Sequence, residues 1–274
     1  MAIQNKSVGG NIDFISNAVL DIVQEVQLTG SYKGRKAYYF NIIGMRAGFT
    51  STSVLNDVKE YDNGVAGVAI TANSSLDIIS SSVNDDGSPV GTGVQTVKVT
   101  YIDVNNNLVQ SGNIVLDGTS LVSNVLTGVN QVLWMESTAV GSGAVAAGNI
   151  RLRINGGTVE VEQITAGGNK SRTGIFMVPV GYTGYIVNWR VSAVGNDQDV
   201  RLRGTVNTLD RTLTSVYHYI AESYCASNTN ISPGNDIYMK IPALTLVKLS
   251  TVSGGTGATI KCIGNMNIII ISNT

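Results

Sequence analysis

The chain has 274 residues, of which only 14% are charged, and its formal net charge is −1 at pH 7. This balance excludes the basic surface that nucleic-acid binding requires, and no apolar run approaches the roughly 20 residues of a membrane-spanning helix. The first residues also lack the basic and apolar regions of a signal peptide, which predicts a protein made in the cytoplasm. We therefore expect neither nucleic acid nor a membrane as a partner.

The first 62 residues differ in pattern from the rest of the chain. The stretch IDFISNAVLDIVQEVQL, residues 12–28, spaces its apolar residues close to a helical repeat. Its many β-branched residues favour an extended backbone instead. We interpret residues 1–62 as an N-terminal arm or attachment segment, with an extended backbone favoured over a helix.

From about residue 65 onward, apolar and polar residues alternate in short runs separated by turn residues. Residues 96–104, TVKVTYIDV, are followed by three asparagines at 105–107, which predicts a β-hairpin because asparagine tolerates the left-handed backbone of such turns. At least ten such strands follow one another at intervals of about ten residues. We predict an all-β fold for residues 63–274, an antiparallel, jelly-roll-like β-sandwich.

Two features of the last third of the chain bear on packing. The final strand, Asn267 to Ser272, is apolar on both faces, which places it in the middle of a sheet or at a subunit contact. Together with the low surface charge, it predicts a homo-oligomer, a trimer or a larger ring. Cys225 and Cys262 both lie in apolar strands, and we expect them to be buried free thiols.

The segment 178–204, VPVGYTGYIVNWRVSAVGNDQDVRLRG, contains the residues most suited to an interface. Strand alternation predicts that Tyr185 and Trp189 share one buried face, with Trp189 as its largest anchor. Tyr182, Tyr185 and Trp189 are candidates for subunit contacts or for stacking on sugar rings.

The same segment ends in RLR, where two arginines flank a leucine. Arg201 and Arg203 alternate with Leu202 and should therefore point outward, where they could pair with the carboxylates of a partner.

No catalytic, cofactor or metal site is predicted, and we expect that the chain is not an enzyme. The only histidine, His218, lies in a strand without a partner nucleophile. The triplet Asp103, Asn105 and Asn107 imitates a calcium loop, but the later ligand positions are apolar. Glu160 and Glu162 could in principle form the carboxylate pair of a glycosidase, although alternation predicts that both face solvent.

Four segments together resemble a family of tailed-bacteriophage virion structural proteins. They are LDIISSSVNDDGSPVGTGVQTVKVTYIDVNNN (76–107), IVLDGTSLV (114–122), AVGSGAVAAGNIRLR (139–153) and FMVPVGYTGYIVNWRVSAVGNDQDVRLRGTV (176–206). The resemblance covers residues from about 40 to 270. It departs in the first 40 residues, and Tyr182 stands where the family pattern has lysine.

The resemblance implies a component of the virion, such as a capsid decoration or cement protein, a head fibre, or a collar or tail protein. It also implies self-association and contact with other virion proteins, such as the major capsid or the portal and collar proteins. Two other hypotheses remain at this point: a receptor- or carbohydrate-binding fibre module, and a glycan hydrolase. Because β-sandwiches carry many functions, the fold alone does not distinguish them.

Overall fold

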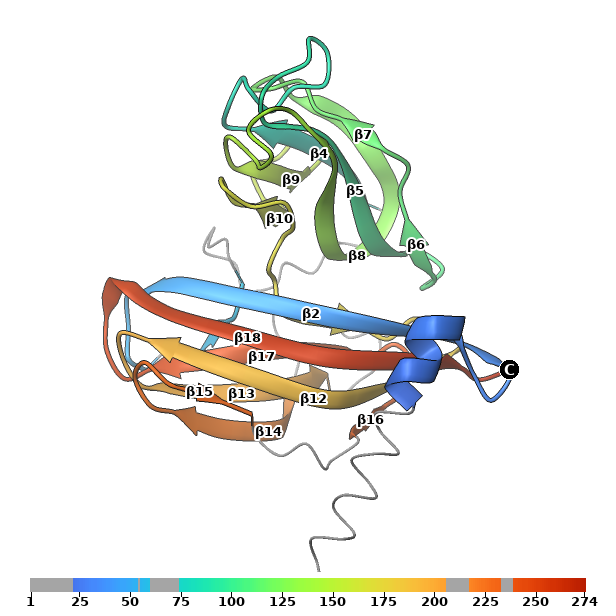
Figure 1. The fold of residues 1–274 in the computed structure, drawn as a ribbon, viewed down its shortest axis with the longest axis vertical. Coiled ribbons are helices and arrows are strands. Elements are labelled where there is room, and N and C mark those ends of the chain that lie inside the picture. The colour runs from blue at the N-terminus through green and yellow to red at the C-terminus, as the bar shows by residue number, and fades with distance from the viewer. Residues whose placement is uncertain (1–21, 54, 60–73, 206–216, 233–238) are drawn as a thin grey trace, which may run out of the picture.

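The computed structural model describes residues 22–53, 55–59, 74–205, 217–232 and 239–274, in which almost every element is a β-strand (Figure 1). The strands form three sheets, and every strand pair within them is antiparallel. This confirms the predicted all-β, antiparallel architecture, while the jelly-roll connectivity stays a prediction.

Two of the sheets pack face to face and form what we call the sandwich. The six-stranded sheet has the order β1 (Ser31–Tyr32), β2 (Arg35–Phe49), β18 (Gly257–Ser272), β12 (Tyr182–Val194) and β15 (Asn230–Ile231), with β16 (Met239–Ile241) also paired to β12. The five-stranded sheet has the order β11 (Ile175–Met177), β17 (Leu246–Ser253), β13 (Gln198–Thr205) and β14 (Tyr217–Cys225), with β3 (Asn56–Asp57) paired to β17. Trp189 and Met266 from the first sheet share one core with Leu202 and Leu249 from the second.

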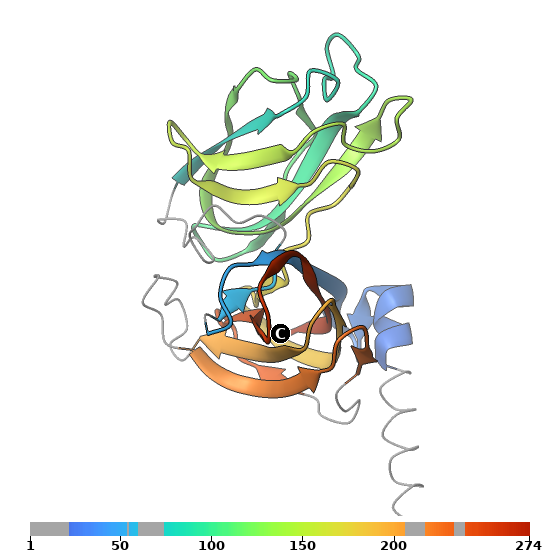
Figure 2. The ribbon, with the colours of Figure 1, turned by 90° about the vertical axis from the view of Figure 1, so that its left-hand side faces the viewer.

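The third sheet, which we call the distal sheet, has seven strands and its own core. Its order is β10 (Glu160–Ile164), β9 (Ile150–Ile154), β4 (Ser74–Ser80), β8 (Val122–Val140), β5 (Val94–Asp103) and β6 (Leu108–Gln110), with β7 (Ile114–Val115) also paired to β5. The sheet curls around apolar residues such as Leu76, Val99 and Met135 (Figure 2). All its strands lie between β3 and β11 in the chain, so the distal sheet is an insertion into the sandwich.

This organisation differs from the division expected at residue 62. Strand β2 lies between β1 and β18 in the six-stranded sheet, and β3 belongs to the five-stranded sheet. Strands β2 and β3 therefore belong to the sandwich and pair with residues more than 190 positions later, and the strands within 74–272 are divided between two cores. The arm predicted for residues 1–21 falls outside the described residues.

The distal sheet meets the sandwich through an aromatic contact and a tight backbone crossing. The ring of Phe40 on β2 lies 5.5 Å from that of Trp134 on β8 and 5.2 Å from that of Phe176 on β11. Beside this contact, the backbones of Val58 and Gly174 press against Gly44, where a side chain would overlap both. Only glycine permits such an approach of three backbone segments.

Residues 22–29 form a helix that lies against the outside of the six-stranded sheet, which corrects the preference for an extended backbone there (Figures 1 and 2). Its Val26 packs on Val187, Ile269 and Ile271. The helix explains why the last strand is apolar on both faces: Ile268 and Ile270 face the sandwich core, whereas Ile269 and Ile271 face the helix. The position of β18 in mid-sheet is confirmed, and its composition no longer requires a subunit contact.

The hairpin predicted at the three asparagines is confirmed by the pairing of β5 with β6. Asn106 has a φ of 65°, the left-handed conformation that the turn needs. Asp103 Oδ1 accepts hydrogen bonds from the backbone N–H groups of Asn105 and Asn107, at 2.9 and 2.8 Å. The carboxylate that imitated a calcium ligand is thus used to close the turn.

Candidate functional site

The three aromatic residues predicted on β12 do not gather on one face. A β-bulge interrupts the pairing of β12 with β18 between Ile186 and Asn188. Because one extra residue reverses the alternation, Trp189 faces the sandwich core, with 3% of its surface exposed, whereas Tyr185 lies on the helix side of the sheet. The prediction that Tyr185 and Trp189 share a face was wrong, but the prediction of Trp189 as a buried anchor is confirmed.

Tyr182 lies at the beginning of β12 and packs against the edge of the sandwich core. Its ring lies 6.1 Å from that of Tyr38, and partial burial together with Tyr38 raises the pKa of its phenol. Trp189 and Tyr182 therefore pack at the centre and at the edge of the sandwich core, whereas Tyr185 lies on the opposite face of the sheet. They form no continuous platform on which a sugar ring could stack.

Both arginines of the RLR stretch pair with carboxylates of their own chain. Arg201 Nε lies 2.7 Å from Glu222 Oε1 on the neighbouring strand, and Arg203 Nη2 lies 2.9 Å from Asp57 Oδ1. The alternation with Leu202 is confirmed, since Leu202 is buried in the core. The two arginines lie on the other face, but Arg203 is mostly buried there.

Asp57 is the centre of this second cluster and is itself buried. Burial opposes its ionisation, but Lys248, whose Nζ lies 3.0 Å from Oδ2, and Arg203 outweigh that effect and lower the pKa of the carboxyl. The Ser250 hydroxyl also donates to Oδ1 at 3.0 Å. A buried charge matched in this way ties β3 to β13 and β17 rather than forming an open binding site.

Glu160 on β10 is buried, which corrects the prediction that it faces solvent. A bulge between Glu160 and Glu162 shifts the register against β9, so simple alternation fails. Glu160 Oε1 lies 3.2 Å from Arg151 Nε and 3.7 Å from Arg153 Nη2. The carboxylate of Glu160 is thus paired with two arginines of β9.

Glu162 is almost fully enclosed, at 1% exposure, which also corrects the expected solvent position. Burial raises the pKa of its carboxyl to about 8, although the Gln163 N–H, the Thr173 hydroxyl and the nearby Lys59 all favour the charged form. A carboxyl sealed in this way, at the junction of the distal sheet and the sandwich, has no opening for a polysaccharide. The geometry gives Glu160 and Glu162 structural partners and no shared cleft.

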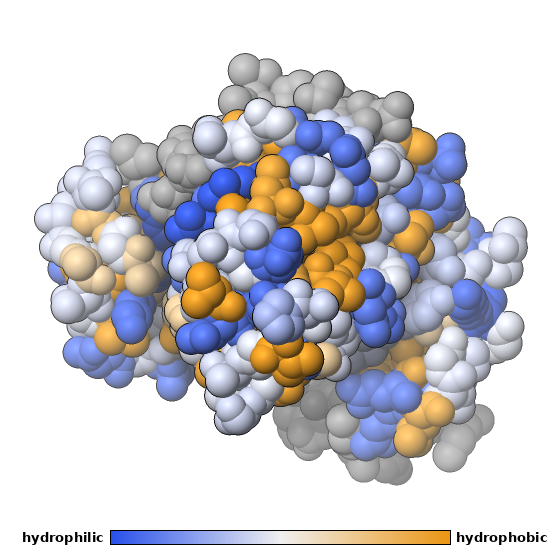
Figure 3. Space-filling model, turned by 90° about the horizontal axis from the view of Figure 1, so that it is seen from above, coloured by the Kyte–Doolittle hydropathy of each residue, from blue (hydrophilic) through white to orange (hydrophobic). Residues whose placement is uncertain are grey.

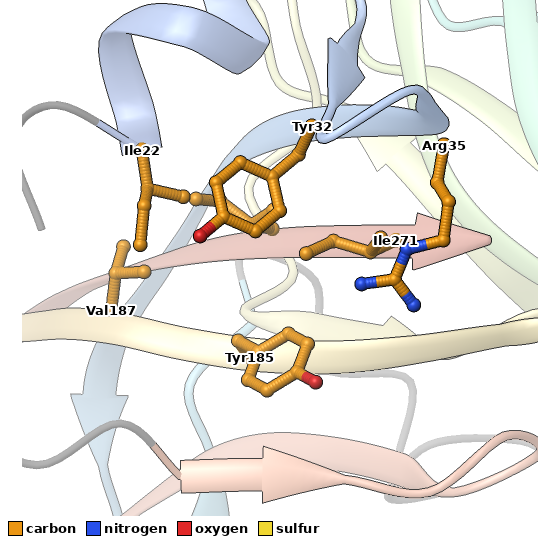
Figure 4. Close-up of a pocket in the computed structure, with 7 residues that line it drawn as sticks. Ile22, Tyr32, Arg35, Tyr185, Val187 and Ile271 are labelled. Atoms are coloured by element: carbon orange, nitrogen blue, oxygen red, sulfur yellow. The ribbon is translucent and has the colours of Figure 1, made fainter. Parts of the chain in front are cut away.

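A pocket of about 260 Å³ lies between the helix and the outer face of the six-stranded sheet (Figure 4). Tyr32 of β1 and Tyr185 of β12 line opposite sides of it, Ile22 and Val187 lie at one end, and the Arg35 guanidinium lies at the other. Ile269 and Ile271 complete the lining. The pocket is therefore apolar with one cationic side chain, and Tyr185 is the only one of the five predicted site residues that reaches it.

Exposed apolar side chains gather at the end of the distal sheet farthest from the sandwich, which we call the tip (residues 81–93, 115–121 and 140–149; Figures 1 and 3). Its exposed large apolar residues are Val83, Val90, Val115, Leu121 and Val140. Val90 and Val83 have 72% and 68% of their surfaces exposed. Single exposed apolar residues are common, but four valines and a leucine in adjoining segments form a patch of the kind that marks an interaction surface.

The tip is held in shape by Asp85, which is completely buried. Its Oδ1 accepts hydrogen bonds from the N–H groups of Val94 (2.9 Å) and Ala147 (2.8 Å). Its Oδ2 accepts from the Gly148 N–H (2.8 Å) and the Ser80 hydroxyl (2.6 Å). Four donors, from both ends of the 81–93 segment and from the 140–149 segment, converge on one carboxylate, so these two loops are fixed relative to each other.

The remaining residues considered for chemistry do not converge. His218 is exposed on β14, opposite Gly204. Cys225 and Cys262 are buried free thiols, as predicted, and burial raises the pKa of Cys262 to about 12. Among the described residues, no three histidine, cysteine or acidic side chains are grouped so that they could hold a metal ion. No helix in the described ranges is long and apolar enough to cross a membrane.

No family model and no curated protein matches the chain. Among solved structures, the chain is similar to one of infectious bursal disease virus, Gx strain, with 10% identity and a TM-score of 0.25, over 92% of this chain and 77% of that chain. It is also similar to a structure of the Gt strain, with 11% identity and a TM-score of 0.20, over 92% and 76%. Similarities this low establish neither a shared fold nor a shared role.

The tip and the helix pocket were not predicted from the sequence. The tip valines are separated by serine, glycine and aspartate, with no period that distinguishes them from ordinary loop residues. Asp85 lies in the polar run SSSVNDDGS, and the sequence does not distinguish a buried aspartate there from an ordinary aspartate in an exposed turn. The available signal was the absence of lysine and arginine from all three tip segments, which is unusual for exposed loops.

Proposed function

We propose that the chain is a non-enzymatic structural component of a virus particle, which assembles through the sandwich and projects the distal sheet. The observation that carries the proposal is that buried carboxylates of the chain bind groups of the same chain and none of them lines an open site. Asp57, Asp85, Glu160 and Glu162 are all buried and matched by donors or cations of the same chain. They build a scaffold, and none of them faces a cleft.

The likeness of four sequence segments to tailed-bacteriophage virion proteins supports the same role. Within that role, capsid decoration, a head fibre, and a collar or tail position are all compatible with a sandwich that carries an inserted sheet. The tip, which is rigid and poor in charge, suits contact with another protein. The expected partners are further copies of the chain and other virion proteins, such as the major capsid or portal and collar proteins.

Quantitative mass spectrometry of purified particles tests this proposal. We expect the chain to be present at a fixed number of copies per particle, matching a multiple of the symmetry of the site that it occupies. A high number would indicate capsid decoration and a low one a collar or tail. Absence from particles that are otherwise complete would contradict the proposal.

Carbohydrate or receptor binding is the second candidate, and the helix pocket is the observation that favours it. The pocket combines two tyrosine rings with the Arg35 guanidinium, a set that suits an acidic sugar. Titration of neutral and acidic monosaccharides, followed by NMR, would test it. Binding that Tyr185→Ala abolishes and Trp189→Phe leaves intact would support this candidate, and no binding of any sugar at millimolar concentration would reject it.

A further inference from the structure

Two apolar surfaces of the molecule lie far apart and carry opposite charge. The tip is at the free end of the distal sheet, whereas the helix pocket is on the outside of the sandwich (Figure 1). The distance between them prevents the tip of a chain from reaching its own pocket. Contact between the two surfaces is possible only between different copies.

The charge of the tip is entirely negative. Its three segments contain no lysine or arginine, and their acidic residues are Asp85, which is buried, and Asp86 and Asp117. Asp86 and Asp117 lie on neighbouring backbone segments that form a β-bridge. Asp86 Oδ1 accepts a hydrogen bond from the Ser88 N–H at 2.7 Å, and Asp117 is exposed. Two carboxylates therefore stand side by side on the same segments that carry Val83, Val90 and Val115.

The charge around the helix pocket is mainly positive. Arg35 lines the pocket, and Lys240 of β16 pairs directly with Tyr185, which places its side chain on the pocket face of the sheet. Lys33 follows Tyr32, with its ammonium 5.2 Å from the Tyr32 ring. Glu25 on the helix carries a carboxylate that accepts a hydrogen bond from the backbone N–H of Lys33. Among the described residues, Arg35, Lys33 and Lys240 thus place three cations around the apolar hollow, against the carboxylate of Glu25.

We propose that the tip of one copy docks in the helix pocket of a second copy. The exposed tip valines would fill the apolar hollow, and Asp86 and Asp117 would meet Arg35 and Lys240 of the second copy. Like surfaces do not satisfy this chemistry, because two tips would bring four carboxylates together and two pockets would bring cations together. A second copy offers both the apolar surface and the opposite charge that each site lacks.

The rigidity of the tip makes this contact favourable. Since Asp85 already fixes the loops, docking immobilises only the side chains and not the backbone. The contact joins two different surfaces of the same chain, so it is head-to-tail. Such contacts close into rings where the rotation permits and otherwise extend as filaments. The inference goes beyond the proposed function, because it holds whether or not the assembly is part of a virus particle.

Charge exchange on the full chain tests the contact. Analytical ultracentrifugation of the wild-type chain should show an association that strengthens with concentration and weakens with salt. The double variant Asp86→Lys/Asp117→Lys and the double variant Arg35→Glu/Lys240→Glu should each weaken this association by at least about tenfold. A mixture of the two double variants should associate again. The basic tip of the first variant then meets the acidic pocket of the second, and the wild-type tip of the second meets the wild-type pocket of the first.

Two exposed charges outside both surfaces supply matched controls. Asp199→Lys on β13 and Lys261→Glu on β18 change the net charge in the same directions and should leave association unchanged. The variant Val83→Ser/Val90→Ser removes apolar surface without changing charge and should also weaken association. Circular dichroism checks that each variant keeps its strands.

The proposal is overturned by a wild-type chain that stays monomeric at every concentration, or by folded double variants that associate like the wild type. Failure of the mixture to associate would also overturn it. These outcomes leave the proposed function to its own test, since a monomer can still be incorporated into particles. Conversely, a chain that associates head-to-tail but is absent from particles would contradict only the virion role.

Discussion

The sandwich core and the tip of the distal sheet hold their backbones in place by different means. In the sandwich, long strands bury Trp189, Leu249 and Ile268 between two sheets, and the favourable free energy comes from apolar area removed from water. At the tip, the valines are exposed, and one buried carboxylate gathers the loops through hydrogen bonds. Because the tip valines are exposed, they contribute no buried area to their own loops, and hydrogen bonds to Asp85 hold the loops instead.

The largest effect should come from the sandwich core. Trp189→Ala removes its largest anchor, and we expect the free energy of unfolding to fall by about 3 to 5 kcal/mol. Urea denaturation followed by the fluorescence of the remaining Trp134 would measure this, with Trp189→Phe as a milder control. A loss below about 1 kcal/mol would mean that the core does not depend on apolar burial at this position.

Removing the hub of the tip should have a smaller and more local effect. Asp85→Ala leaves three backbone N–H groups without their acceptor, which we expect to cost about 2 to 3 kcal/mol. Hydrogen exchange should become faster in residues 81–93 and 141–149, while the strands of the sandwich keep their protection. Asp117→Ala, which removes an exposed carboxylate of the same tip, is the matched control. If the sandwich lost as much hydrogen-exchange protection as the tip, the two regions would not be held by different means.

Glu162, at the junction of the sandwich and the distal sheet, should make the free energy of unfolding depend on pH. Its pKa of about 8 in the folded chain is above the ordinary value of 4.5, so the folded state holds this proton more tightly. The resulting stabilisation is complete below pH 4.5 and is lost progressively as pH rises from there through 8. Glu162→Gln should therefore show a smaller fall in melting temperature between pH 5 and pH 8.5 than the wild type. Glu222→Gln, on an exposed pair, should retain the wild-type slope.

The smallest effect should come from the helix on the outside of the sandwich. Val26→Ala removes two methyl groups from the contact with Ile269 and Ile271, at a cost of about 1.5 kcal/mol. Chemical denaturation would measure it, with Leu28→Ala as control, because Leu28 is 85% exposed on the same helix. Identical losses in the two variants would show that the helix contributes only its own propensity and does not cover the sheet.

The sequence predicts well what depends on neighbouring residues. Alternation indicates the strands, the asparagines at 105–107 indicate their turn, and the apolar surroundings of Cys225 and Cys262 indicate buried thiols. Each of these depends on a few consecutive residues, where backbone and side-chain preferences act directly.

What the sequence does not predict depends on distant partners or on one extra residue. The pairing of β2 with β18 joins positions more than 200 residues apart, so the insertion of the distal sheet is invisible in local patterns. Bulges at Val187 and before Glu162 reverse the expected faces of Tyr185 and Glu162, because one added residue inverts the alternation. Tyr185 is the only residue of the pocket that was predicted as a site residue. The pocket forms only because the helix at residues 22–29 packs against strands that lie far away in the sequence.

The backbone crossing at Gly44 has a consequence for how this architecture could arise and be reused. The chain departs toward the distal sheet at Val58 and comes back at Gly174, and both positions press on the same glycine. A segment whose two ends meet can be exchanged for another without moving the strands that receive it. Residues 59–173 thus enter and leave the sandwich at one point, so a foreign domain with adjacent termini should be displayed in the same position if it covers Phe40 as Trp134 does.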